Sequence, residues 1–231
     1  MKRPQTIAIT ATFTAEPVEE SLDFWMHTLD IPSEIVFAPY NQVFQQLLDP
    51  TSLLSQNQHG LNVVLVRLED WRRFDHTADA ESGRDIFPLT VLQEKMAQTV
   101  HDFVAAVKTA AGRASVPYLV CLCPASPTAH VDAECQALFA AMETQLTTAL
   151  TKVGGVYLAS AVDLMALYQV NTYYDAHTDT LGHVPYTQLG FTALGTLVAR
   201  KLYAIQSPPH KVIVLDCDQT LWKGSAVKMA C

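Results

Sequence analysis

The chain of 231 residues lacks the features that mark secreted, membrane-bound and nucleic-acid-binding proteins. No apolar run reaches the roughly 18 residues that a membrane helix needs, and the amino-terminal segment has no apolar core of a secretion signal. Its five cysteines are an odd number without a CxxC pair, which argues against a disulfide framework or structural zinc. With 15 Lys and Arg against 23 Asp and Glu, the net charge of -8 argues against nucleic acid or an anionic membrane as partner. We therefore expect a cytoplasmic protein with reduced cysteines.

The apolar residues are arranged as in a folded α/β protein. Short apolar runs bounded by turn residues alternate with longer stretches in which apolar residues recur at every third or fourth position. This alternation predicts a three-layer α/β/α sandwich with a mainly parallel sheet of about five strands, of flavodoxin-like or SGNH-like type. Strands are predicted at residues 6–12, 34–38, 61–67, 117–122 and 156–159, and helices at residues 18–29, 42–48, 89–111, 132–153 and 187–205.

Two segments are predicted to be long loops, at residues 71–88 and 173–186. Loops that leave the carboxyl ends of parallel strands line the ligand crevice of such a sheet. The second loop is rich in His and Asp, which makes it our candidate for the rim of a pocket. The prolines at residues 208 and 209 predict a linker at 206–210, which separates an α/β domain (1–206) from a new apolar strand within 207–231.

The new strand runs into the sharpest motif of the chain, Asp216, Asp218 and Thr220 in the pattern D-x-D-x-T. Two carboxylates at the carboxyl end of a parallel strand can hold Mg²⁺ and leave an oxygen free to attack phosphorus. The segment resembles the first motif of the haloacid dehalogenase (HAD) superfamily. This resemblance implies that Asp216 is the nucleophile that accepts a phosphoryl group, that Asp218 is the general acid and base, and that Thr220 fixes the turn. The alternative is a strand that ends in a solvated acidic turn.

The surrounding sequence resembles a narrower family. The segments IAITATFTAEPVEESLDFW, VFAPYNQVFQQLLDP, LVRLEDW, GHVPYTQLGFTALGTLVARKL and LDCDQTLWKG are similar to the FkbH family of polyketide and nonribosomal peptide biosynthesis. In that family a degenerate SGNH-hydrolase-like domain precedes a HAD domain. The resemblance implies that a glyceryl or related three-carbon unit is captured from a phosphorylated donor (1,3-bisphosphoglycerate), loses phosphate and is transferred to the phosphopantetheine thiol of an acyl carrier protein.

A HAD site also needs a Ser or Thr, a Lys and a further acidic pair downstream, and only residues 221–231 follow the motif. We therefore expect the chain to be catalytically incomplete and cut from a longer polypeptide; the alternative is that the motif is vestigial.

An SGNH esterase would place a serine directly after the first strand and a D-x-x-H motif near the last helix. Here Thr12 and Thr14 follow the first strand, and His183 is preceded by Asp179 at four positions rather than three. The triad therefore looks broken. Two alternatives to the loading activity stay open: a non-catalytic module that binds the carrier protein or its phosphopantetheine arm, and an esterase with a threonine nucleophile.

Thr12, Thr14 and Asp179 are also candidates for a substrate or carrier pocket, and three further residues join them. His183 either contacts pantetheine or an acyl oxygen, or packs beside Tyr186, which is itself a candidate. Arg67 closes the third strand, where an anion or carbonyl would sit in an open sheet; the alternative is a salt bridge with Glu69 or Asp70.

Two residue sets are weaker candidates. Cys217 is a candidate acyl-accepting thiol, although strand alternation directs it away from Asp216 and Asp218. The acidic and histidine residues between positions 175 and 183 match no metal-ligand template.

Overall fold

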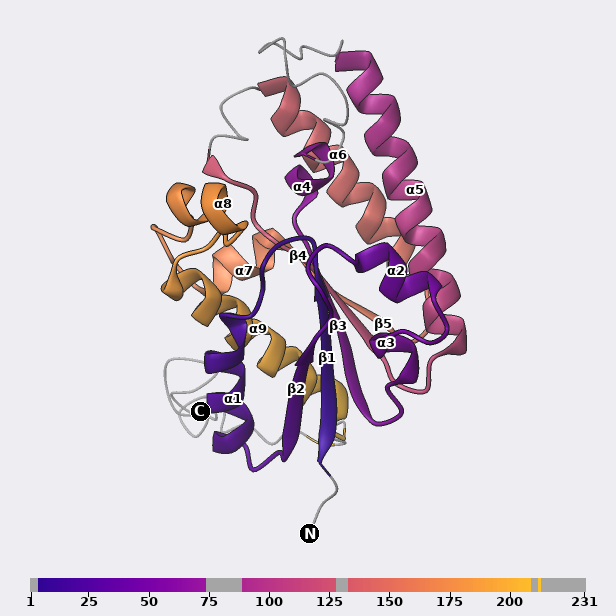
Figure 1. The fold of residues 1–231 in the computed structure, drawn as a ribbon, viewed down its shortest axis with the longest axis vertical. Coiled ribbons are helices and arrows are strands. Elements are labelled where there is room, and N and C mark those ends of the chain that lie inside the picture. Colours follow the sequence, from indigo (N-terminus) through magenta and orange to yellow (C-terminus); the bar gives the residue numbers. More distant parts are fainter. Residues whose placement is uncertain (1–3, 74–88, 128–132, 209–211, 213–231) are drawn as a thin grey trace, which may run out of the picture.

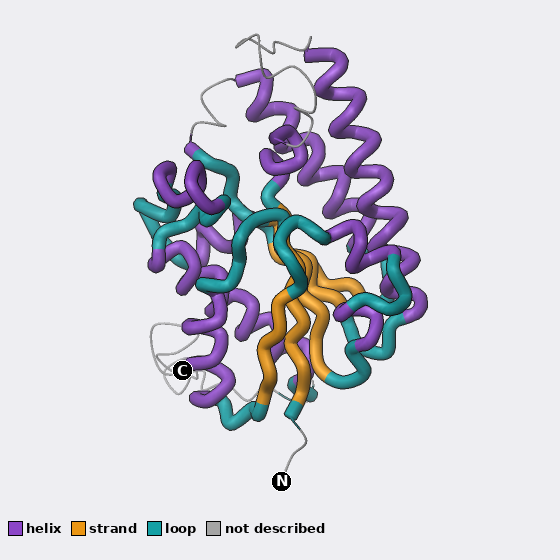
Figure 2. Tube along the Cα trace, in the orientation of Figure 1, coloured by secondary structure: helices purple, strands orange, loops and turns teal. Residues whose placement is uncertain are grey.

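The computed structural model describes residues 4–73, 89–127, 133–208 and 212. Their five strands form one parallel sheet in the order β2-β1-β3-β4-β5. The strands are β1 (Gln5–Ala11), β2 (Ser33–Phe37), β3 (Gly60–Val66), β4 (Tyr118–Leu122) and β5 (Val156–Ala159). Each predicted strand is confirmed to within one residue at either end. The predicted three-layer architecture is also confirmed, because helices cover both faces of the sheet (Figures 1 and 2).

One face of the sheet is covered by α1 (Val18–Thr28), α7 (Ala161–Leu167) and α9 (Gln188–Gln206). Ile7 and Ile9 of β1 point into this layer and are fully buried. The two long helices α1 and α9 approach closely at Gly195, because a Cβ there would collide with the Ser21 hydroxyl and lie 3.1 Å from the Val18 carbonyl oxygen.

The opposite face is covered by α2 (Val43–Leu48), α3 (Leu53–Gln56), α4 (Leu68–Arg73), α5 (Leu89–Arg113) and α6 (Ala133–Leu150). Ala8, which alternates with Ile7 and Ile9 along β1, is buried in this second layer. The sheet is thus apolar on both faces, as a parallel sheet between two helical layers requires.

The prediction of an unbroken loop at residues 173–186 is wrong, because α8 (Ala176–Gly182) lies within it. Asp175 caps this helix: its carboxylate accepts hydrogen bonds from the backbone N–H groups of His177 and Thr178, which stabilises a helix that has little apolar periodicity. The loop predicted at 71–88 begins too early, since α4 extends to Arg73. Helices α3 and α7 were not predicted either. Both are short, and each begins at a serine that caps it.

Two sequence predictions remain untested. Helix α9 ends at Gln206, where the linker is predicted, but the HAD strand and its motif lie outside the described residues, so the division into two domains stays a prediction. None of the helices in the described part of the chain has the length and apolarity needed to cross a bilayer; the cytoplasmic location also stays a prediction.

Candidate functional site

The candidate site lies where the strand order reverses, at the carboxyl ends of β1 and β3. Because β1 pairs with β2 on one side and with β3 on the other, the chain leaves these two strands in opposite directions and opens a crevice between them. Thr12 directly follows β1 and Arg67 directly follows β3. Helices α4 and α8 lie at this end of the molecule (Figure 1).

Arg67 is completely buried and is held by three carboxylates. Its Nε donates to Asp70 Oδ1 at 2.9 Å, and its two terminal nitrogens donate to both Asp179 oxygens at 2.9 and 3.0 Å. Glu69 Oε1 lies 3.1 Å from Arg67 Nη1. Burial alone would lower the pKa of Arg67, but the hydrogen bonds to Asp179 and Asp70 raise it above the ordinary value. We call Arg67, Glu69, Asp70 and Asp179 the ionic cluster.

The salt bridges weighed as the alternative for Arg67 are therefore both present, with Asp179 as a third partner. All three carboxylates are at least nine-tenths buried, so the guanidinium is enclosed by protein groups and does not contribute to a basic surface.

Thr12 is part of the same arrangement. Its hydroxyl donates to Asp70 Oδ2 at 2.8 Å and accepts a hydrogen bond from the backbone N–H of Arg67 at 3.0 Å. The Thr14 hydroxyl donates to the carbonyl oxygen of Gly182 at 2.8 Å. Neither hydroxyl proton is directed at His183, the histidine that an esterase triad would use as its base. These residues thus do not form an esterase triad with His183.

His183 ends α8 with a left-handed backbone (φ 52°), and its ring stacks on Tyr40 at a centroid distance of 5.3 Å. Tyr186 is buried, its hydroxyl donates to the carbonyl oxygen of Pro124 at 2.7 Å, and burial raises its pKa well above the ordinary value. The structure thus places His183 at the edge of the site and Tyr186 in the core beneath it.

Sequence reasoning missed the roles of two residues at this edge, Tyr174 and Ser126. Tyr174 donates to Asp179 Oδ2 at 2.9 Å, and the backbone N–H and hydroxyl of Ser126 both donate to Glu69 Oε2 at 2.9 Å. The pattern R-x-E-D after an apolar strand indicates only Glu69 and Asp70, the salt-bridge partners already weighed for Arg67, and no local pattern marks Tyr174 or Ser126. Among the described residues, no group of three or more His, Cys, Asp or Glu side chains is placed to hold a metal ion.

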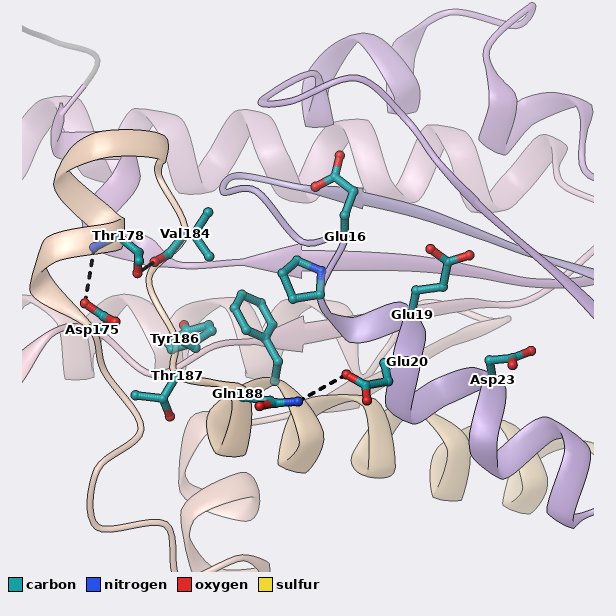
Figure 3. Close-up of a pocket in the computed structure, with 12 residues that line it drawn as sticks. Glu16, Glu19, Glu20, Asp23, Asp175, Thr178, Val184, Tyr186, Thr187 and Gln188 are labelled. Atoms are coloured by element: carbon teal, nitrogen blue, oxygen red, sulfur yellow. Dashed lines mark hydrogen bonds between the residues drawn. The ribbon is translucent and has the colours of Figure 1, made fainter.

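Two hollows border this end of the molecule. The first, which we call the acidic groove, measures about 680 Å³ and runs between α1, α8 and the start of α9 (Figure 3). Its carboxylates come from α1, the loop before it and the cap of α8: Glu16, Glu19, Glu20, Asp23 and Asp175. The groove would repel a phosphorylated ligand.

The second hollow, which we call the switch-point pocket, measures about 470 Å³ and lies between α2, α4 and α5 with Thr12 in its wall. The described residues that line it include no carboxylate: Thr12, Asn41, Val43, Phe44, Gln45, Trp71, Lys95, Met96, Gln98 and Thr99. Its volume is typical of pockets that bind small molecules.

The predicted HAD residues Asp216, Cys217, Asp218 and Thr220 all lie outside the described residues, so their roles stay predictions. The structure therefore describes the α/β domain and its carboxyl edge.

No family model matches the chain, and no curated protein matches its sequence. Its fold is similar to a solved structure, the crystal structure of the N-terminal part of the protein BF1531 from Bacteroides fragilis, which contains a phosphatase domain and is complexed with magnesium. The similarity covers 97% of this chain with a TM-score of 0.72 and 16% sequence identity. The chain spans 58% of the length of that structure. At this level of identity the likeness shows a shared fold.

Proposed function

We propose that this chain is the amino-terminal part of an FkbH-like acyltransferase and phosphatase, which loads a glyceryl or related three-carbon unit from 1,3-bisphosphoglycerate onto an acyl carrier protein. The observation that carries the proposal is the shared fold with the N-terminal part of BF1531, a structure that contains a phosphatase domain and magnesium. The D-x-D-x-T motif of this chain, which resembles the first motif of HAD phosphatases, supports the proposal from the sequence.

In the proposed reaction, the carrier thiol attacks the acyl carbonyl of 1,3-bisphosphoglycerate and displaces the acyl phosphate as inorganic phosphate. Asp216 accepts the remaining phosphoryl group from the phosphate ester while Asp218 protonates the departing hydroxyl oxygen, and a water molecule that gives its proton to Asp218 then hydrolyses the aspartyl phosphate and releases the second phosphate. Hard carboxylate oxygens are the ligands that Mg²⁺ prefers, so the donor chemistry of these two residues suits that ion, which would neutralise charge on the phosphoryl group. In this scheme Thr12 and Thr14 are not nucleophiles: their hydroxyls donate to Asp70 and to the carbonyl oxygen of Gly182.

The test is intact-protein mass spectrometry of a holo carrier protein incubated with magnesium and 1,3-bisphosphoglycerate. It uses this chain and a form continued through a complete HAD domain. We expect the continued form to add one glyceryl unit to the carrier, and Asp216→Asn to abolish the addition. Loading that persists in Asp216→Asn would refute the role of Asp216, and no loading by either form would refute the proposal.

A second candidate function is a non-catalytic module that binds the carrier protein or its phosphopantetheine arm. It is favoured by the residues that follow β1, where an SGNH hydrolase places its serine: this chain has Thr12 there, and the Thr12 hydroxyl donates to Asp70 rather than to a histidine. The module should bind a holo carrier at micromolar concentrations and release no p-nitrophenol from a short-chain ester. Ester hydrolysis that His183→Ala abolishes would instead identify an active esterase.

A further inference from the structure

A third hollow lies at the end of the molecule opposite to α4 and α8, where the strands begin (Figure 1). We call it the amino-edge hollow; it measures about 380 Å³ and is bordered by the last turn of α1 and the start of β2. Met26, which is 3% exposed, and the half-buried Ile31 line it together with the exposed rings of Pro4 and Pro32. The hollow therefore has an apolar wall.

The rim of the amino-edge hollow is acidic. Asp23 and Asp30 are both exposed, and no Lys or Arg stands among the described residues that line the hollow. The Asp23 carboxylate lies 3.3 Å from Nδ1 of His27, which is also exposed. The hollow therefore favours a ligand that has an apolar side and carries positive charge.

The chain leaves the α/β domain beside this hollow. Gln206, the last residue of α9, donates a hydrogen bond from its side-chain amide to Gln5, whose own amide donates to Ser33 at 3.1 Å. Ser33 lines the hollow. Val212, which is 75% exposed, follows Gln206 by six residues, and six residues span at most about 21 Å. The polypeptide after Val212 therefore starts near the hollow, which gives it a high effective concentration there.

The sequence after the D-x-D-x-T motif suits this hollow in apolar character and in charge. Residues 221–229 read LWKGSAVKM and combine four large apolar side chains with two lysines and no carboxylate. Trp222 is the largest of these side chains, and tryptophan is enriched where protein surfaces bind each other because its ring buries much apolar area. Residues 1–3 are also cationic and adjoin the hollow at Pro4, but they contain no aromatic side chain. Residues 221–229 are therefore the better complement.

We propose that the amino-edge hollow is the docking site of residues 221–229 of the same chain. Trp222 packs in the hollow against Met26 and Ile31, and the two lysines of the segment pair with the carboxylates of the rim. Most of the affinity comes from the apolar contact, because exposed ion pairs contribute little. The inference goes beyond the proposed function, since it concerns where this segment binds and not which reaction the motif serves.

Docking at this edge also fixes the place of the D-x-D-x-T motif, which directly precedes the segment. Helix α9 begins beside Glu20, near the start of α1, and ends beside Gln5. Its 19 residues span about 28 Å at 1.5 Å per residue. The motif is thus held at the opposite end of the domain from the ionic cluster. A phosphoryl group on Asp216 and a ligand in the switch-point pocket therefore bind at separate places.

The test is limited proteolysis of the full chain by trypsin, which cleaves after Lys223 and Lys228, with the products followed by mass spectrometry. A free peptide of residues 219–231 gives the cleavage rate of the undocked segment. The protection factor is the rate for the peptide divided by the rate for the chain at the same bond. We expect it to be at least about ten, because a docked segment is cleaved only while it is released.

The double variant Asp23→Asn/Asp30→Asn removes the charge of the rim. We expect it to lower the protection factor by about two- to tenfold, the effect of losing two exposed ion pairs. Both positions are exposed, and asparagine tolerates the left-handed backbone of Asp30 (φ 53°), so the fold is preserved. The matched control Glu94→Gln/Asp102→Asn removes two exposed carboxylates from α5, outside the hollow, and should stay within about twofold of the parent.

A further variant, Trp222→Ala, tests the apolar contact. It is compared with a peptide that carries the same substitution, so that any direct effect on trypsin cancels. We expect its protection factor to fall below about three, because truncating a tryptophan at the centre of an interface weakens binding by more than about tenfold.

A protection factor near one, or equal protection in the parent and in either the double variant or Trp222→Ala, would overturn the inference. Protection that rises with protein concentration would show that the segment binds a second copy, and protection confined to the bond after Lys2 would assign the hollow to residues 1–3; either result would overturn it as well. Protection that both variants weaken, together with failure of the loading assay, would support the inference and refute only the proposed function. Successful loading together with equal protection in parent and variants would refute only the inference.

Discussion

Replacing Arg67 by methionine tests whether the ionic cluster holds the carboxyl edge together. Methionine has an unbranched side chain that occupies much of the space of the arginine stem but carries no charge and no donors. The substitution removes the hydrogen bonds from Arg67 to Asp70 and Asp179 and the ion pair with Glu69. Three buried carboxylates then remain without a cation from the ionic cluster.

Removing one partner of a buried ion pair costs about 3–5 kcal/mol, because the remaining charge stays desolvated. Three hydroxyl groups, from Thr12, Tyr174 and Ser126, continue to donate to the carboxylates and offset part of this loss. We therefore expect Arg67→Met to lower the free energy of unfolding by about 3 kcal/mol, near the lower end of the range for a broken buried ion pair. For a chain of this size, a loss of 3 kcal/mol lowers Tm by about 6–12 °C.

The measurement is urea unfolding followed by far-ultraviolet circular dichroism. Arg67→Lys keeps the positive charge but loses the planar guanidinium. Its free energy of unfolding should therefore lie between those of the parent and Arg67→Met. Arg72→Met is the matched control, because Arg72 is exposed on α4, and it should cost less than about 1 kcal/mol. An unfolding free energy of Arg67→Met within about 1 kcal/mol of the parent would show that the ionic cluster does not stabilise the fold.

Three further predictions concern the core and the helices. Burial raises the pKa of Cys121 from 9.0 to about 12, so the thiol ionises in the unfolded chain before it ionises in the folded one. As pH rises from 8 to 11, this difference lowers the free energy of unfolding by about 2–3 kcal/mol. Urea unfolding at both pH values should show that Cys121→Val, which has no thiol, loses about 2–3 kcal/mol less than the parent. Gly195→Ala should destabilise the chain by about 1–3 kcal/mol because its methyl group would collide with Ser21, whereas Gly112→Ala, where the added methyl meets open space, should be neutral or stabilising in thermal unfolding. Asp175→Ala should lower the free energy of unfolding by about 0.5–2 kcal/mol, because it removes the cap of α8. Amide hydrogen exchange should become faster in α8 while exchange in α9 stays as in the parent.

The sheet could be predicted because its sequence signal is local. Runs such as Leu61–Val66 are almost entirely apolar, as a strand buried on both faces must be, and a turn residue precedes each of them. The long helices were equally visible from residues such as Phe139, Met142 and Leu146, which recur on one face and are buried in the structure. The short helix α8 was missed because its formation depends on a side-chain cap more than on apolar periodicity.

The candidate site could be predicted only in part. Arg67, Thr12 and Asp179 were each identified as candidates from their positions after strands or near the last helix, and the structure brings them together. Their mutual contacts could not be predicted, because Arg67 and Asp179 are 112 residues apart in the chain and meet only through the packing of α8. The roles of Tyr174 and Ser126 depend on the same long-range packing.

The sequence separation between Arg67 and its carboxylate partners also affects folding during synthesis on the ribosome. Asp70 emerges three residues after Arg67, but Asp179 emerges 112 residues after it, a delay on the order of 10 s at ordinary rates of translation. During that interval Arg67 can pair with only two of its three carboxylates. Helix α9, which packs against one face of the sheet at β1, has not yet been synthesised. A nascent chain therefore exposes apolar sheet surface until nearly all of the domain has been synthesised, and this interval is when a chaperone would protect it most.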